Sequence, residues 1–152
     1  MFMKPCLQSL AAACVLASLS TAALPQAAPV AVPDDTLYRA LGARPGLERL
    51  MDDFTQRLQT EARMRPFFKD LNRIELKDKL VVQLCELAGG PCKREGPGML
   101  KVHSGVDIAR KDFNAMVDVL QDSMDMQQIP FRTQTRLLAL LAAMHREIVN
   151  LP

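Results

Sequence analysis

His103 is the residue whose type and setting suggest chemistry, and it is one of only two histidines in the 152-residue chain. A lone imidazole cannot complete a zinc site or a nucleophile–base pair. Its neighbours at helical spacing, Met99, Leu100 and Val106, are apolar. Haem iron needs one neutral imidazole beside an apolar slot, so His103 is a candidate iron ligand. The alternative is a solvated or hydrogen-bonded side chain with no ligand role.

The spacing of apolar residues predicts that helices position this histidine, and no stretch alternates as a strand would. About half of the chain is apolar and aromatic residues are scarce, so leucine and methionine must form the core, which favours helices. The expected elements are a short helix over 36–42, a helix from Pro45 with Leu47, Leu50, Met51, Phe54 and Leu58 on one face, a corner at 66–68, a helix from the Asn72 cap to Gly89, a short helix over 99–104, a helix with Phe113, Met116, Val117, Leu120 and Met124 on one side, and a last helix over about 132–149. We therefore expect one all-α domain.

Two of these helices have an expected inward face that can be stated by residue. The helix after Asn72 is expected to bury Ile74 or Leu76 together with Leu80, Leu84 and Leu87. The last helix is expected to bury Leu137, Leu138, Leu141, Met144 and Ile148, with His145 at the surface beside Arg146 and Glu147.

The first residues have the pattern of an export signal. Lys4 precedes an apolar run over 10–19, and small residues follow it. The run is short for a membrane span, so we expect cleavage between Ala22 and Ala28 and a mature chain in the periplasm with no span. Residues 1–28 are thus the signal and its cleavage region, and 29–35 form a Pro/Ala tether.

Two other interpretations of the N-terminal segment are an uncleaved anchor helix and a lipoprotein acylated at Cys14. Gln8 and Ser9 shorten the apolar run, which disfavours the anchor, and the run continues past Cys14, which disfavours acylation there. The formal net charge is +2 and no basic stripe stands out, so we expect no nucleic-acid partner.

Removal of the signal takes away Cys6 and Cys14 and leaves Cys85 and Cys92, an even pair in an exported chain. We expect a disulfide, which would stabilise the fold by about 2–3 kcal/mol by closing a small loop. Two free thiols are the alternative. A metal site is disfavoured because no further Cys or adjacent His completes a ligand set.

Five stretches together are similar to the group I truncated haemoglobins: LYRALGARPGLERLMDDF, MRPFFKDLN, LKDKLVVQLCELAGGPCKREG, MLKVHSGVDI and DFNAMVDVL. The similarity covers about residues 36–149. It implies a truncated, two-on-two globin fold over 36–150, with a b-type haem between two helix pairs. It also implies that His103 is the proximal iron ligand and that a Cys85–Cys92 bridge would join the end of the distal helix to the proximal loop.

The resemblance assigns further positions in the same way. Phe68 corresponds to the phenylalanine that stacks on the haem, although plain core packing would look identical in sequence. Gly89 and Gly90 correspond to a glycine pair that lets the proximal segment loop freely, and an earlier family pair is reduced here to Gly42-Ala43. The full set of expected haem contacts is Phe68, Leu76, Lys79, Leu80, Leu100, Val106, Phe113 and Val117.

The distal side departs from the family pattern. Thr55 stands where many members have tyrosine, and Leu76 and Leu80 stand where many have glutamine. A donor to a dioxygen ligand is worth about 1.5–3 kcal/mol. Without it we expect an apolar pocket that holds oxygen loosely and favours carbon monoxide or nitric oxide. The amide of Gln83 and the hydroxyl of Thr55 are substitute donors.

Lys79 has two interpretations. The residue at this position is a sixth iron ligand in some relatives, and an amine can become one if burial lowers its pKa. We favour an ion pair with a haem propionate, for which Lys101 is a second candidate.

The function expected from these residues is reversible binding of oxygen, nitric oxide or carbon monoxide by a haem protein. Nitric oxide dioxygenase or peroxidase-like side chemistry would need an electron donor that this chain does not encode. The alternatives are a haem-based sensor with a periplasmic partner and a helical interaction module without haem.

Overall fold

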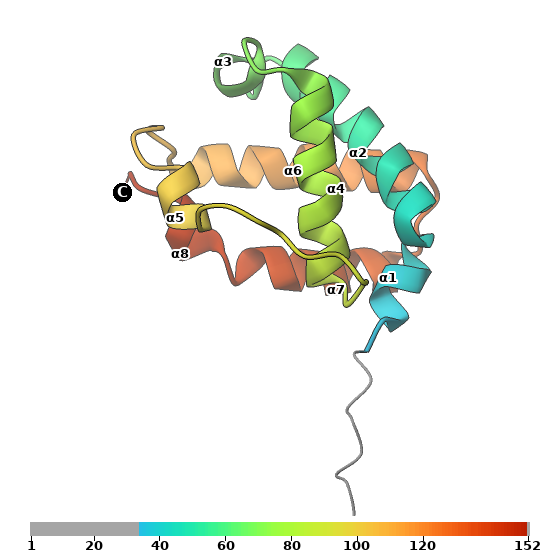
Figure 1. Cartoon of the computed structure of the whole chain (residues 1–152). Helices are drawn as coiled ribbons and strands as arrows, with labels where there is room; N and C mark the ends of the chain where they lie inside the picture. The colour runs from blue at the N-terminus through green and yellow to red at the C-terminus, as the bar shows by residue number, and fades with distance from the viewer. Residues whose placement is uncertain (1–33, 152) are drawn as a thin grey trace, which may run out of the picture. The chain divides into compact units, whose positions relative to one another are not determined.

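The computed structural model describes residues 34–151 (Figure 1). The expected signal segment and the tether up to residue 33 lie outside the described residues, so those predictions stay predictions. Within 34–151 all regular secondary structure is helical, as predicted. The elements are α1 (Thr36–Ala40), α2 (Ala43–Thr60), α3 (Arg65–Phe68), α4 (Arg73–Leu87), α5 (Met99–Val102), α6 (Arg110–Met126), α7 (Phe131–Ala142) and α8 (His145–Ile148).

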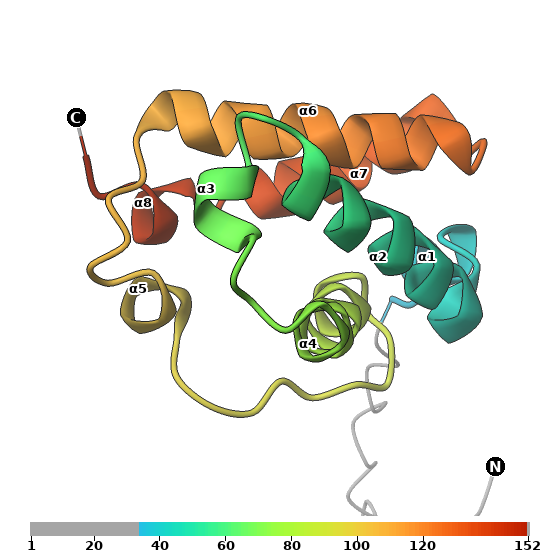
Figure 2. The ribbon, with the colours of Figure 1, turned by 90° about the horizontal axis from the view of Figure 1, so that it is seen from above.

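The core forms around α2, which packs against α4 on one side and α6 on the other (Figure 2). Its apolar residues recur every three or four positions, so they share one face, and that face is fully buried. The buried residues are those expected from the spacing, namely Leu47, Leu50, Met51, Phe54 and Leu58. Helices α6 and α7 run side by side, and α1 also packs on α7.

Helix α4 begins where the sequence predicts. Asn72 has extended backbone angles, and its side-chain oxygen accepts hydrogen bonds from the backbone N–H groups of Ile74 and Glu75 at 3.0 and 3.2 Å. This cap satisfies two of the N–H groups that the first turn of a helix leaves free. The helix ends at Leu87, just before Gly89, whose φ of +83° favours glycine.

The buried face of α4 differs from the expected one. The fully buried residues are Val81, Leu84, Cys85 and Ala88, whereas Ile74 is 51% exposed. Leu76, Leu80 and Leu87 are only half-buried. Because α4 carries apolar residues on two sides, periodicity alone does not say which side packs against α2, and only Leu84 of the expected face is correct without qualification.

The last expected helix is in fact two helices. A turn at 143–144 separates α7 from α8, and Met144 donates its backbone N–H to Leu141 over 3.0 Å, one residue short of the α-helical partner. Met144 is therefore the residue before α8 and lies half-buried, not inside a continuous helix. The turn redirects the chain so that α8 packs against α5.

Candidate functional site

The imidazole of His103 is oriented by its own helix. His103 follows the four-residue helix α5 and is half-buried, and its Nδ1 lies 2.9 Å from the backbone oxygen of Met99. A carbonyl oxygen can only accept, so in the neutral ring Nδ1 carries the proton. The lone pair then lies on Nε2. Metal-ligating histidines commonly have this arrangement, in which one ring nitrogen binds the metal and the other donates a hydrogen bond.

A stripe of half-buried side chains runs along α4 beside the face that packs on α2. We call the stripe the outer face of α4, and its members are Leu76, Leu80, Gln83 and Leu87. Their spacing of four, three and four residues places them on one side of the helix. Leu80 and Leu87 touch the core at its edge, while the rest of the stripe is covered only in part.

The other expected haem contacts also lie at intermediate or high exposure, with one exception. Phe68 and Val117 are half-buried, Val106 is 38% exposed and Leu100 is 66% exposed. Phe113 is buried. Single exposed apolar residues are ordinary and occur elsewhere in this chain, but Leu100, Val102 and Val106 are all exposed within three residues of His103.

The described residues fit a haem. His103 offers one nitrogen ligand, and no group of three His, Cys, Asp or Glu side chains within 34–151 is arranged to hold a bare metal ion. The outer face of α4 supplies apolar surface that is not fully covered. The oxygen Oε1 of Gln83 is buried and has no hydrogen-bond partner among the described residues, as expected beside a site for a further group.

The two substitute donors on the distal side differ in their geometry. Thr55 is completely buried, and its hydroxyl donates to the backbone oxygen of Met51 at 2.7 Å, with Asp52 O at 3.3 Å. A hydroxyl has one hydrogen to give, so that of Thr55 is used within α2. The Gln83 amide nitrogen lies 4.0 Å from Met144 Sδ, a weak acceptor. Gln83 is thus the donor whose amide is free to turn to another partner.

Lys79 points along the surface of α4. Its Nζ lies 2.6 Å from Glu75 Oε1, and both side chains are well exposed. The hydrogen bond from Lys79 lowers the pKa of the Glu75 carboxyl. Lys101 is also exposed. Ligation by Lys79 and propionate pairing by either lysine stay predictions.

His145 is not a surface residue as expected. It is half-buried, and its ring meets that of Phe113 edge to face, with centroids 4.8 Å apart and planes at 77°. The charges of Arg146 and Glu147 had suggested an exposed position. In the single turn of α8, however, these two side chains are exposed while that of His145 is half-buried.

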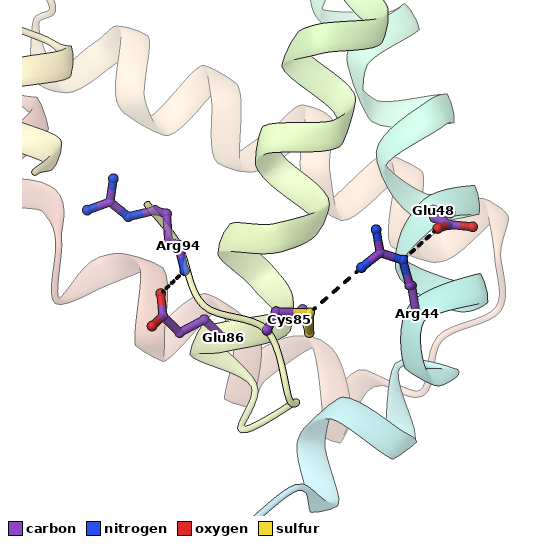
Figure 3. Close-up of a disulfide and its surroundings, with 6 residues drawn as sticks. Arg44, Glu48, Cys85, Glu86 and Arg94 are labelled. Atoms are coloured by element: carbon purple, nitrogen blue, oxygen red, sulfur yellow. Dashed lines mark hydrogen bonds and ion pairs between the residues drawn. A yellow bond between two sulfur atoms is a disulfide. The ribbon is translucent and has the colours of Figure 1, made fainter. Parts of the chain in front are cut away.

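Cys85 and Cys92 form the expected disulfide, with Cα atoms 5.7 Å apart (Figure 3). The guanidinium of Arg44 lies 3.9 Å from Cys92 Sγ. A second tie holds the same loop, because the backbone N–H of Arg94 donates to Glu86 Oε2 at 3.1 Å. The start of the segment between α4 and α5 is therefore fixed to the end of α4.

The glycine pair 89–90 lies where other parts of the chain pack closely against its backbone. A Cβ on Gly89 would lie 2.0 Å from the backbone oxygen of Asp34, and one on Gly90 would lie 2.7 Å from both Cys85 Sγ and the Tyr38 ring. The backbone N–H of Tyr38 donates to Ala88 O at 3.0 Å. These glycines permit close packing of the first described segment on the end of α4, and the looping of the proximal segment expected from this pair stays a prediction.

Two contacts of His103 were not expected from the sequence, one with Met99 and one with Asn150. Met99 accepts the His103 ring proton through its backbone, a partner that the four-residue helical spacing could have indicated. Asn150 contacts the segment after His103 from the far end of the chain, and no sequence pattern pointed to it.

Comparisons with known proteins agree on one family. A family model described as bacterial-like globin matches residues 36–150. A group 1 truncated hemoglobin of Nostoc commune is 25% identical over 115 residues, which cover 76% of this chain and 98% of that protein. One of Mycolicibacterium paratuberculosis is 27% identical over 115 residues, covering 76% of this chain and 85% of that protein. The truncated hemoglobin of Tetrahymena pyriformis in its Fe(III) form is similar in structure, with a TM-score of 0.72 at 18% identity over 75% of this chain and 97% of that one.

Proposed function

The chain belongs to the bacterial-like globin family and is a group I truncated globin, a class that binds gaseous ligands, and from this premise we propose that it holds a haem b through His103 and binds oxygen, nitric oxide or carbon monoxide reversibly. The sequence has no Cys-x-x-Cys-His stretch for covalent attachment, which supports a haem held without such links. A bound haem would supply the iron at which a diatomic gas binds.

The observation that carries this proposal is the hydrogen bond between His103 Nδ1 and Met99 O at 2.9 Å. It selects the tautomer whose free lone pair is on Nε2 and restrains rotation of the ring. The outer face of α4 would cover part of the porphyrin, with Leu76 and Leu80 on the ligand side. The exposed side chains of Leu100 and Val106 would be shielded from solvent by the same haem.

The distal residues support loose retention of oxygen. Thr55 donates within its own helix, and Leu76 and Leu80 on the outer face have no polar hydrogen, so the amide of Gln83 is the substitute donor that remains on α4. A dioxygen ligand would therefore lack the charge-assisted hydrogen bond that a tyrosine at position 55 or a glutamine at position 76 or 80 would give, and only Gln83 is left to replace it. Carbon monoxide depends less on such a donor.

A cavity variant tests the iron ligand. We expect the full chain to gain a Soret band with hemin, His103→Gly to lose it, and added imidazole to restore it to His103→Gly, because the ring alone supplies the bond. His145→Gln is the matched control, since it removes the other histidine and should retain the band. Equal hemin binding by His103→Gly without imidazole would refute the assignment.

A second variant tests the apolar distal side. Leu80→Gln places an amide donor on the outer face of α4, and we expect oxygen dissociation to slow by about tenfold, at about 1.4 kcal/mol per factor of ten. Carbon monoxide dissociation should change much less. If the parent already releases oxygen as slowly as Leu80→Gln, a distal donor such as Gln83 is present and the apolar pocket is wrong.

We also propose a cellular location for the protein. The Cys85–Cys92 disulfide supports an exported, oxidising location, where such bonds persist. Nitric oxide or peroxide turnover would require an external electron donor of unknown identity.

A further inference from the structure

The short helix α5, which directly precedes the proposed iron ligand, is weakly anchored by its own residues. Helix α5 has four residues, none of them buried, and it lies between Gly98 and Gly105. Gly105 has a φ of +78°, and the space around the missing Cβ of either glycine is open to at least 4 Å. Apolar burial therefore contributes little to holding the turn that ends in His103.

The side chain of Asn150 bridges the two ends of the segment that follows α5. Its Oδ1 accepts a hydrogen bond from the backbone N–H of Ile108 at 2.8 Å. Its Nδ2 donates to the backbone oxygen of His103 at 3.2 Å. One uncharged amide, which has both a donor and an acceptor group, thus connects the backbone of His103 to that of Ile108.

The backbone beside Asn150 adds to this bridge. The N–H groups of Asn150 and Leu151 both donate to Ile108 O, at 3.1 and 3.0 Å. The end of the chain accordingly lies beside α5 and α8 in Figure 1. The segment after His103 is closed by four hydrogen bonds to two residues that are more than forty positions away in sequence.

We propose that Asn150 is a positioning residue for His103, which fixes the last turn of α5 and thereby the direction in which Nε2 approaches the iron. The proposal rests on the proposed function, since it concerns the same ligand. The Met99 carbonyl restrains rotation of the ring, and Asn150 restrains the backbone from which the ring projects. Loss of the second restraint leaves a glycine-flanked single turn free to fray.

Two substitutions separate the two halves of the bridge. Asn150→Ala removes both side-chain hydrogen bonds. Asn150→Asp keeps an acceptor for the Ile108 N–H but removes the donor to the His103 carbonyl and places negative charge against it. Asn114→Ala is the matched control, because Asn114 is an exposed asparagine on α6.

The first measurement uses the full chain without haem, by backbone hydrogen exchange. We expect the Ile108 amide to exchange about tenfold faster in Asn150→Ala and near the parent rate in Asn150→Asp and Asn114→Ala, as one exposed hydrogen bond would give. Unchanged exchange over 103–108 in Asn150→Ala overturns the bridge.

The second measurement uses the hemin-loaded, reduced protein. We expect the iron–histidine stretching band in resonance Raman spectra to shift or broaden in both Asn150 variants, and haem loss to quicken by about tenfold in Asn150→Ala. A band identical to that of the parent in both variants overturns the positioning role alone. A parent that takes up no hemin overturns the proposed function and the positioning role with it, even where the exchange result stands.

Discussion

Helices α4 and α5 carry the residues expected on either side of a haem, and they are held in place by different forces. Helix α4 has fifteen residues, a side-chain cap at Asn72, a buried face on α2 and a disulfide at its end. Helix α5 has four residues and no buried one, and the histidine that follows it has its ring hydrogen-bonded to Met99 and its backbone oxygen hydrogen-bonded to Asn150.

The difference shows where the fold is fixed before a cofactor arrives. A fully buried leucine side chain contributes about 1.5–3 kcal/mol to the stability of the fold. A typical hydrogen bond within the protein contributes only about 0.5–1.5 kcal/mol, because it replaces hydrogen bonds to water. The wall formed by α4 is therefore set by the core, and the turn that ends in His103 is the part expected to gain order when haem binds.

The largest expected effect comes from a core substitution in α4, the better-anchored of the two helices. Leu84 is 3% exposed on the face of α4 that packs on α2, so Leu84→Ala should lower the free energy of unfolding by about 2–4 kcal/mol, with or without haem. Denaturant titration of both forms measures it.

On α5, Leu100→Ala should change the haem-free stability by less than about 0.5 kcal/mol, since Leu100 is 66% exposed, while weakening hemin binding. A similar loss of haem-free stability in both variants would contradict the contrast.

The disulfide gives the next effect, because it ties the start of the loop toward α5 to the end of α4. Reduction should lower the free energy of unfolding by about 2–3 kcal/mol through the larger freedom of the unfolded chain. Comparison of thermal unfolding with and without a dithiol reductant measures the change. The double variant Cys85→Ala/Cys92→Ala should not respond to the reductant, and a response there would place the effect elsewhere.

The smallest effect concerns a polar anchor on the α2 side, at the corner between α2 and α3. The Glu61 carboxylate accepts hydrogen bonds from the Arg63 side chain at 2.8 Å and from the backbone N–H groups of Arg63 and Met64 at 2.7 and 3.1 Å. The Arg63 side chain first, then these N–H groups, lower the pKa of Glu61. The contribution of the Glu61 carboxylate to the free energy of unfolding is therefore complete above the pKa of 4.5 in the unfolded chain. It is lost as the pH falls through the lowered pKa of the folded chain.

Glu61→Gln checks this dependence by urea unfolding at about pH 7 and about pH 3. We expect the variant to be slightly less stable than the parent at the higher pH and to approach it at the lower one. A stability difference that is the same at both pH values would show that the charge of Glu61 is not involved.

The sequence could predict elements whose signals are local. The face of α2 repeats every three or four residues, Asn72 caps α4 and a glycine ends it, so these helices were expected with nearly correct bounds. The pairing of Cys85 with Cys92 followed from a small set of cysteines. His103 stood out because the chain has so few histidines.

Other features depend on contacts that no local pattern shows. Helix α4 has two apolar stripes, so Val81 and Leu80 were indistinguishable until α2 was in place. The turn at 143–144 interrupts a pattern of apolar residues that a continuous helix would also show. Asn150 acts across 42 and 47 residues of sequence on Ile108 and His103, and one asparagine near a chain end gives no signal of such a bridge.

An equilibrium titration of hemin into the purified, haem-free chain examines whether the outer face of α4 and His103 together form a haem site. We expect a Soret band distinct from that of free hemin, which saturates at one haem per chain and converts to a carbon monoxide form after reduction. A spectrum that remains that of free hemin throughout the titration would show that this globin fold does not hold the cofactor.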